Sequence, residues 1–297
     1  MRPPLNNVPL GGKTSFRIGG SCRYYCAPVN EEEISGACVW ARQNNTPVFV
    51  LGKGSNVLVS DSGWNGLVID LSDKWTAIRW SGDSAECSSG ALLHTLVKES
   101  VERGLAGLEK LAGIPGSAGG AVVMNAGAFG QSVSDCLTSV QFLSLPDGAL
   151  KTLQAQDINA SYRSTFFKTS KSIILSAEFR FSKDSSGAAK KSFSEVLAKR
   201  KERHPLDLPN CGSVFKNPPG TTAGKLIEQC GLKGAKRGAA EVSQKHANFI
   251  VNHGGATAKD VRGLIVQVQR TVYEKKGVLL EPEVVMVGEF EEELFRP

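Results

Sequence analysis

Two glycine-dense segments carry the residues best suited to hold a phosphorylated ligand. One covers residues 51–57 (LGKGSNV) and the other covers residues 112–120 (AGIPGSAGG). Glycine allows positive φ angles and close approach of backbone N–H groups to a ligand, and consecutive exposed amides bind phosphate. Neither segment is a P-loop or a Gly-x-Gly-x-x-Gly turn, because residues 52–56 run into the β-branched stretch 57–59 instead of opening a helix. We therefore predict a dinucleotide whose diphosphate is held by both segments in another kind of fold.

Small residues continue past the second segment, over residues 125–130 (NAGAFG), and a single arginine follows among aromatic residues at Tyr162-Arg163. The small-residue stretch is compatible with a ligand-binding turn or with a tightly packed core turn. A lone arginine is usually a surface residue, so Arg163 taken alone is a weak signal.

Two further motifs place potentially reactive side chains beside apolar residues. Ser213 follows a glycine but lacks the Gly-x-Ser-x-Gly frame of a nucleophile elbow, so it fits a strand edge as well as a site. Glu281 and Glu283 open an apolar stretch and share one face of a strand unless Pro282 breaks the register. A carboxylate that enters a buried strand needs a partner or changes its pKa. The spacing around His246 favours a structural role.

Composition limits the class of protein. The chain has 297 residues, 41% hydrophobic and 22% charged, which is typical of a globular protein of two domains. No apolar run approaches the ~20 residues that cross a bilayer, and the N-terminal residues have no apolar core of a secretory signal. Seven scattered cysteines without a Cys-x-x-Cys pair predict reduced thiols in the cytoplasm, with no metal site. The dispersed net charge of +6 suits phosphorylated ligands better than nucleic acid.

Hydrophobic periodicity and capping residues predict the elements that would position these motifs. The expected helices cover residues 31–45 with Asn30 as N-cap, 91–103, 221–230, and 257–275 with a Thr257/Asp260 capping box. The expected strands cover residues 47–51, 57–59, 66–71, 173–181, 246–252 and 279–287, with a hairpin from Val140 around the turn Pro146-Asp147-Gly148. This pattern predicts an α+β protein with a dinucleotide-binding domain over residues 1–182, a linker over 183–192 and a smaller substrate domain over 193–297.

Taken in order, the motifs resemble one family over nearly the whole chain, the UDP-N-acetylenolpyruvoylglucosamine reductases, also called UDP-N-acetylmuramate dehydrogenases. The resemblance rests on residues 14–20 (TSFRIGG), 51–56, 112–120, 124–127 (MNAG), 162–163, 212–218 (GSVFKNP), 223–227 (AGKLI) and 280–284 (LEPEV). Residues 181–212 contain no tyrosine-bearing insertion, so the chain resembles the shorter, second type of this family.

The resemblance implies an FAD-binding domain of the vanillyl-alcohol-oxidase (PCMH) kind followed by an α/β substrate-binding domain. It implies noncovalent FAD, NADPH as co-substrate, and a role in peptidoglycan precursor synthesis in the cytoplasm, with no nucleic acid, membrane or obligate protein partner. The implied catalytic residues are Arg163, Ser213 and Glu283. The implied cofactor contacts are Leu51, Gly52, Lys53, Gly54, Ser55, Asn56, Val57, Gly113, Ile114, Pro115, Ser117, Gly119, Gly120, Asn125, Ala126 and Gly127. The implied substrate contacts are Tyr162, Arg163, Ser213, Lys216, Asn217, His246 and Glu283.

The chemistry that the resemblance implies assigns each catalytic residue a role. Arg163 would stabilise an enolate-like charge, Glu283 would position Arg163 or hold a proton, and Ser213 would protonate the substrate carbon. We expect Arg163 and Glu283 to share one site. Two other interpretations stay open at this point: a flavin oxidase of the same cofactor fold acting on an alcohol or sugar, and a nucleotide-binding regulator without turnover. The first predicts rapid oxygen use without NADPH, and the second does not need the arginine, serine and glutamate together.

Overall fold

The computed structural model describes residues 3–145 and 148–297, and their contacts group the chain into two compact units. Unit 1 contains residues 25–53 and 67–200 together with Pro3 and Pro4, and unit 2 contains residues 5–24, 54–66 and 201–297. This grouping differs from the contiguous division expected from the sequence, because two N-terminal segments belong with the C-terminal part. The boundaries of functional domains at residues 182 and 193 stay a prediction.

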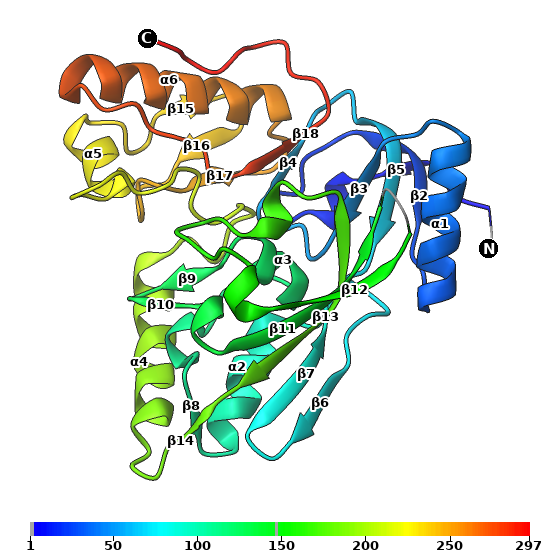
Figure 1. Ribbon diagram of the computed structural model, residues 1–297. Coiled ribbons are helices and arrows are strands. Elements are labelled where there is room, and N and C mark those ends of the chain that lie inside the picture. The colour runs from blue at the N-terminus through cyan, green and yellow to red at the C-terminus, as the bar shows by residue number, and fades with distance from the viewer. Residues whose placement is uncertain (1–2, 146–147) are drawn as a thin grey trace. The chain divides into compact units, whose positions relative to one another are not determined.

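Unit 1 is built around a five-stranded antiparallel sheet with the strand order β12-β11-β13-β7-β6 (Figure 1). Its strands are β6 (Ile78–Ser81), β7 (Ser84–Ser88), β11 (Leu137–Ser144), β12 (Leu150–Gln154) and β13 (Ser172–Arg180). Helices α2 (Leu93–Glu102) and α3 (Ala118–Val123) bury their apolar faces in the same core, through residues such as Leu96 and Val122. The second glycine segment therefore leads directly into a helix that packs on this sheet.

The first glycine segment follows β3 (Val48–Leu51), which belongs to a second group of elements in unit 1. Strand β3 pairs in parallel with the part of β5 (Trp64–Asp70) that belongs to this unit, from Leu67 onward. Helix α1 (Glu31–Gln43) precedes β3, and the Asn30 side chain caps it by accepting from the Glu33 amide at 2.8 Å. The expected order of helix, strand, glycine turn and strand is confirmed.

Short elements complete unit 1. They are β8 (Leu105–Ala106), β9 (Gly127–Ala128), β10 (Gln131–Ser132), β14 (Ser182–Lys183) and several single turns of 3₁₀ helix. The chain passes between the units within β2 (Ser21–Cys26), β5 and helix α4 (Ala188–Arg203).

Unit 2 packs two helices with a three-stranded sheet of order β15-β16-β17 (Figure 1). Its elements are β1 (Leu5–Pro9), β4 (Val57–Val59), α5 (Ala223–Gln229), β15 (Lys236–Arg237), β16 (Ala240–Val242), β17 (Ile250–Asn252), α6 (Ala258–Lys276) and β18 (Val285–Val287). The Thr257/Asp260 capping box of α6 is confirmed, and the Asp61 carboxylate adds bonds from the amides of Ala258 and Lys259 at 2.8 and 2.9 Å. Strand β18 pairs in parallel with β4, which fixes the C-terminal segment beside residues 57–59.

The stretch 183–192 includes the end of β14 and the start of α4, and its role as a linker between functional domains stays a prediction. Two expectations about local structure need correction. Only Ile250–Asn252 of the expected strand 246–252 forms a strand, since the Phe249 amide instead bonds the His246 carbonyl in a turn. Only Val285–Val287 of the expected strand 279–287 is a strand, and Pro282, which has no N–H, forms an isolated bridge with Phe215. Strands β11 and β12 form the expected hairpin, whose turn residues Pro146 and Asp147 lie outside the described residues.

All seven cysteines are free thiols, and five of them are buried. Burial raises the pKa of Cys87 to about 12, so this side chain is uncharged at neutral pH. Across the residues that the structure describes, no three His, Cys, Asp or Glu side chains gather as metal ligands. Within that same part of the chain, no helix combines the length and apolar character needed to cross a membrane.

Candidate functional site

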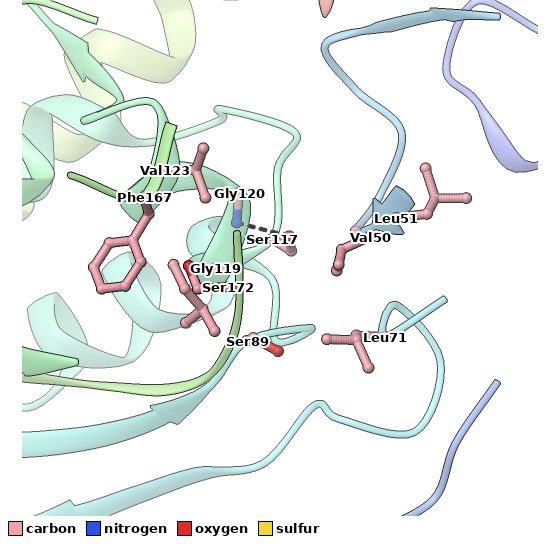
Figure 2. A pocket seen from close by; sticks show the side chains of 12 residues that line it. Val50, Leu51, Leu71, Ser89, Ser117, Gly119, Gly120, Val123, Phe167 and Ser172 are labelled. Atoms are coloured by element: carbon pink, nitrogen blue, oxygen red, sulfur yellow. Dashed lines mark hydrogen bonds between the residues drawn. The ribbon is translucent and has the colours of Figure 1, made fainter. Parts of the chain in front are cut away.

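The two glycine segments line one pocket in unit 1 (Figure 2). Leu51 and Gly52 come from the end of β3, whereas Ser117, Gly119 and Gly120 come from the turn into α3 and its first residues. The pocket measures about 450 Å³, counting the part open to solvent. Besides Leu51, its apolar lining residues are Val50, Leu71, Val123, Phe167 and Ile174. The sequence-based prediction that both segments serve one ligand thus has a geometric basis.

Close packing between the two segments requires glycine. A Cβ atom on Gly52 would lie 2.3 Å from the Ser117 Oγ, and one on Gly119 would lie 2.8 Å from the Ser89 Cβ. The Ser117 hydroxyl also accepts a bond from the Gly120 amide at 3.3 Å, which caps the start of α3 (Figure 2). The small residues therefore bring two backbone turns together at the pocket rather than merely making each turn flexible.

Backbone amides at this pocket are available to a ligand. Within residues 3–145 and 148–297, the N–H groups of the lining residues Gly52 and Ser117, and of Lys53 next to Gly52 in the chain, donate to no protein acceptor. Buried or half-buried amides are normally paired, so a set without protein partners suits the oxygens of a diphosphate. The Lys53 ammonium, in contrast, donates to the Ser72 carbonyl at 2.6 Å. The contribution of Lys53 to a cofactor site would therefore come from its backbone.

Ser89 is a pocket residue that the sequence analysis missed. It is 5% exposed, and in the described part of the chain its hydroxyl has no hydrogen-bond partner. A buried hydroxyl without a partner costs free energy unless a ligand or water satisfies it. Ser89 lines the pocket only because the fold places it directly after β7 and against Gly119, and the sequence around it shows no distinguishing motif.

A tight turn presents Arg163 next to the third small-residue segment. Ser161 and Ser164 exchange backbone hydrogen bonds of 2.9 and 3.2 Å, and Arg163 between them has a left-handed φ of +56°. Its guanidinium donates to the Gly127 carbonyl at 2.8 Å and lies over the Tyr162 ring, 5.0 Å from the centroid. A left-handed backbone conformation at a non-glycine residue costs about 1–3 kcal/mol, and residues strained in this way are found most often at functional sites.

Asn125 ties this turn to the second glycine segment. It is 7% exposed, donates from its side chain to the Ser161 carbonyl at 3.0 Å, and accepts from the Ser134 amide at 3.1 Å. Thr165 adds a bond from its hydroxyl to the Val123 carbonyl at 3.0 Å. The structure thus joins two motifs of unit 1 that the sequence analysis treated separately, and it gives Asn125 a supporting role for the Arg163 turn.

The remaining predicted contacts of the second segment lie along the same stretch. The Gly113 amide donates to the His94 Nδ1 at 3.1 Å, and Ile114 and Pro115 continue the turn toward Ser117. The Ala126 amide bonds the Ala121 carbonyl at 2.8 Å. His94 lies in α2 and contacts the second glycine segment through the bond from the Gly113 amide, and Cys87 lies in β7.

Arg200 is a second residue that sequence reasoning missed. Its Cδ would lie 3.1 Å from a Cβ on Gly113, and its guanidinium lies 5.9 Å from the centroid of the Phe129 ring. The Nε atom is buried and has no partner in the described part of the chain, and burial lowers the pKa of this guanidinium from its ordinary value. In the sequence, Arg200 is one of several basic residues of helix α4, and nothing distinguishes it from the others.

In unit 2, the Ser213 and Glu283 motifs lie on adjacent segments. The Glu283 amide donates to the Val214 carbonyl at 2.7 Å, and the Lys216 amide donates to the Glu281 carbonyl at 2.9 Å. Both Ser213 and Glu283 are half-buried, and within the described residues the Ser213 hydroxyl has no hydrogen-bond partner. Gly212, with φ +79°, turns the chain into this segment. Main-chain pairing therefore places the segments that carry the predicted catalytic residues Ser213 and Glu283 next to each other.

Three other predicted substrate contacts have structural partners in unit 2. The Lys216 ammonium pairs with the Glu281 carboxylate, and the Asn217 side-chain oxygen accepts from the Ala223 amide at 3.0 Å at the start of α5. His246 is half-buried, and burial lowers the pKa of its imidazole below the ordinary value, with Lys233 adding to the effect. His246 is therefore neutral at pH 7, and its substrate contact stays a prediction.

The second half of the first glycine segment belongs to unit 2. A Cβ on Gly54 would lie 2.3 Å from the Lys13 carbonyl, and Val57 pairs with Val285 in the β4–β18 ladder. The Asn56 side chain donates to the Glu283 carbonyl at 3.2 Å, so it supports the main chain of a predicted catalytic residue. Cofactor contacts from Gly54, Ser55, Asn56 and Val57 stay predictions.

Two family models match this chain and identify its class of protein. A family model described as an FAD binding domain matches residues 22–154, and one described as the C-terminal domain of UDP-N-acetylenolpyruvoylglucosamine reductase matches residues 204–287. The protein is therefore a flavoprotein of the predicted α+β architecture, with an FAD-binding domain of the vanillyl-alcohol-oxidase kind.

Curated relatives then define the family. The chain is 42% identical to a UDP-N-acetylenolpyruvoylglucosamine reductase of Agathobacter rectalis, over 96% of this chain and 94% of the relative. It is 41% identical to the reductase of Caldicellulosiruptor bescii, over 99% and 93% respectively. The crystal structure of the reductase from Thermus caldophilus matches with a TM-score of 0.81 at 34% identity, over 95% and 98%. The chain belongs to the UDP-N-acetylenolpyruvoylglucosamine reductase family.

The close contact between the glycine segments gives a first testable prediction. Gly52→Ala should weaken FAD binding about 5–150-fold, because the new Cβ would overlap the Ser117 Oγ. The shift that relieves this overlap, worth about 1–3 kcal/mol, would move the Gly52 and Ser117 amides away from their positions at the pocket. Quenching of FAD fluorescence on titration with apoprotein measures this affinity. Gly12→Ala is the matched control, since nothing lies within 4 Å of its Cβ position. Ser117→Gly in the Gly52→Ala background should restore binding, and unchanged affinity in Gly52→Ala would show that this contact is not part of the FAD site.

Proposed function

We propose that this protein reduces the enolpyruvyl ether of UDP-N-acetylglucosamine to UDP-N-acetylmuramate, with FAD as cofactor and NADPH as co-substrate. The observation that supports this most strongly is the 42% identity to curated reductases over 96% of the chain. The proposed role is in peptidoglycan precursor synthesis in the cytoplasm, with small molecules as the only required partners.

The hydrogen-bond donors at the unit 1 pocket suit the polar groups of a flavin dinucleotide. The amides of Gly52, Lys53 and Ser117 have no protein acceptors in the described residues, and the Ser89 hydroxyl is buried without a partner. Apolar side chains such as Phe167 line the rest of the pocket. These residues would hold the diphosphate with main-chain donors and exclude water from the ring system. Bound FAD supplies a carrier that takes up hydride from NADPH and passes it to the substrate.

In the reduction of the substrate, Arg163 stabilises the negative charge that develops and Ser213 supplies the proton. Hydride addition to the terminal vinyl carbon leaves an electron pair on the carbon beside the carboxylate. The planar guanidinium of Arg163 stabilises this enolate-like charge. The Ser213 Oγ–H donates its proton to the same carbon, forming the C–H bond of the lactyl product, and solvent returns a proton to the serine oxygen. The hydride and the proton together saturate the double bond.

Glu283 serves the same step from the segment adjacent to Ser213. As a half-buried carboxylate it would hold a proton for the relay or polarise the reacting group. Tyr162, Lys216, Asn217 and His246 would contact the nucleotide–sugar. Lys216 already pairs with Glu281, so substrate phosphate would compete with that carboxylate for the ammonium.

A two-step titration tests the proposed function. Without oxygen, NADPH should bleach the yellow colour of the FAD-loaded protein, and the enolpyruvyl nucleotide–sugar should restore it with formation of UDP-N-acetylmuramate. UDP-N-acetylglucosamine, which lacks the enolpyruvyl group, is the control and should leave the protein bleached. Recovery of colour with oxygen alone, and none with the enolpyruvyl substrate, would instead indicate a flavin oxidase.

A further inference from the structure

Asn248 is a buried asparagine whose side chain clamps the segment that carries Ser213. It is 4% exposed, and its carboxamide oxygen accepts from the Phe215 amide at 3.0 Å. Its carboxamide nitrogen donates to the Phe215 carbonyl at 2.8 Å. One side chain thus satisfies both polar groups of a single residue, as a neighbouring strand would do.

The Asn248 backbone adds two further bonds. Its carbonyl accepts from the Val214 amide at 2.8 Å, and its amide donates to the His246 Nδ1 at 3.2 Å. On the opposite side of the same segment, the Val214 carbonyl accepts from the Glu283 amide, and Phe215 bridges Pro282. Residues 214 and 215 are therefore held between Asn248 and the Glu283 motif.

Ser213 itself lacks such fixation. Within residues 3–145 and 148–297 its hydroxyl has no hydrogen-bond partner, and the preceding Gly212 has the left-handed φ that makes the chain permissive. The Gly212 amide donates to the Asn210 side-chain oxygen at 2.9 Å, and residues 214 and 215 are held by Asn248 and the Glu283 motif. The flanking main chain on both sides therefore sets the position of the Ser213 Oγ. A proton donor that is misplaced by about 1 Å can lose a factor of ~10² in rate.

From these contacts we propose that Asn248 is a positioning residue for Ser213: its two-point bond to Phe215 fixes the place from which the serine hydroxyl donates its proton. This inference rests on the proposed function, in which Ser213 is the proton donor. Asn248 does not touch the substrate in this proposal and acts only through the segment 213–215.

Asn252 offers a matched control in the same unit, four residues further along the chain. It is 3% exposed, and its side chain also clamps backbone groups, donating to the Phe16 carbonyl at 3.0 Å and accepting from the Gly254 amide at 2.8 Å. Substitution of either asparagine by alanine removes comparable buried hydrogen bonds, so both variants should lose similar stability. Only the Asn248 contacts lead to Ser213.

Stopped-flow measurements of the two half-reactions of the FAD-loaded enzyme test this proposal. Asn248→Ala should slow reoxidation by the enolpyruvyl substrate about 10–10²-fold and leave reduction by NADPH nearly unchanged, whereas Asn252→Ala should change neither rate. In a Ser213→Ala background, Asn248→Ala should cause no further loss, because it acts through the serine. If Asn248→Ala does not fold, Asn248→Asp keeps the acceptor for the Phe215 amide but loses the donor, and it should show the same selective loss.

The outcomes separate this inference from the function on which it rests. A deleterious Ser213→Ala combined with a harmless Asn248→Ala would overturn the positioning role alone. Equal losses from Asn248→Ala with and without Ser213 would also overturn it. If Ser213→Ala itself is harmless, the proposed catalytic role of the serine fails first.

Discussion

Ser213→Ala should slow the reduction of the enolpyruvyl substrate ~10²–10⁴-fold, which is the usual cost of losing a positioned general acid. Reduction of the enzyme by NADPH should stay nearly unchanged, because that half-reaction moves hydride and requires no proton from the serine. Stopped-flow absorbance of each half-reaction, without oxygen, separates the two effects. The structure supports this expectation, since the half-buried Ser213 hydroxyl has no hydrogen-bond partner within the described residues and its removal leaves no protein group unsatisfied.

Two variants sharpen the Ser213 experiment. Ser213→Cys places a more acidic proton donor at the same position and should recover part of the lost rate. Ser21→Ala changes an exposed serine of the same unit and should leave both half-reactions intact. Equal slowing of both half-reactions in Ser213→Ala would mean that the serine is structural.

Local signals in the sequence predicted most of the helices and several strands. Asn30 before α1 and the Thr257/Asp260 pair at α6 cap their helices as expected, because capping depends only on residues three positions apart. Strand expectations failed where a side chain or a proline competes with the ladder. Within the expected strand 246–252 the His246 side chain accepts from the Asn248 amide, and the Asn248 side chain bonds Phe215 of another segment. Pro282 interrupts the expected strand 279–287.

The sequence predicted the motifs of the candidate site, but not the buried residues that pack around these motifs. Glycine content identified the two segments that meet at the pocket, and the overlap between a Gly52 Cβ and Ser117 explains why small residues occur there. Ser89 and Arg200 were missed because their importance arises from burial without a partner, a property of the folded chain. Asn248 was missed for the related reason that its bonds to Phe215 span 33 residues.

The grouping of the chain could not be inferred from composition. Residues 5–24 and 54–66 belong to unit 2 through long-range contacts such as the Asp61 bonds to the start of α6 and the pairing of β4 with β18. A polar, small-residue stretch at 182–187 suggested a linker. In the structure Ser182–Lys183 form β14, and the Asp184 carboxylate caps the start of α4 by accepting from the Ala189 amide at 2.8 Å. Linker and cap use the same residue types, so only tertiary context separates them.

Arg163→Lys should slow the reduction of the enolpyruvyl substrate about 10²–10³-fold, which is the loss seen when one preorganised donor to a developing anion is removed. Lysine keeps the charge but loses the planar fork, which in this protein is held by the Gly127 carbonyl at 2.8 Å and by the Tyr162 ring. The NADPH half-reaction should be nearly unchanged. Arg180→Lys, on an exposed arginine of β13, is the matched control for the chemical change and should leave both half-reactions at their original rates.

Backbone strain at Arg163 allows its catalytic and structural contributions to be separated. Because this residue has a φ of +56°, Arg163→Gly should be more stable to unfolding than Arg163→Ala by about 1 kcal/mol, since glycine adopts that conformation without a Cβ penalty. Both variants should nevertheless be equally slow with the enolpyruvyl substrate, because neither carries a guanidinium. Chemical denaturation measures the stability difference, and stopped-flow absorbance measures the rates. If the glycine variant instead regained activity together with stability, Arg163 would act by shaping the turn, and its role in stabilising the enolate-like charge would be wrong.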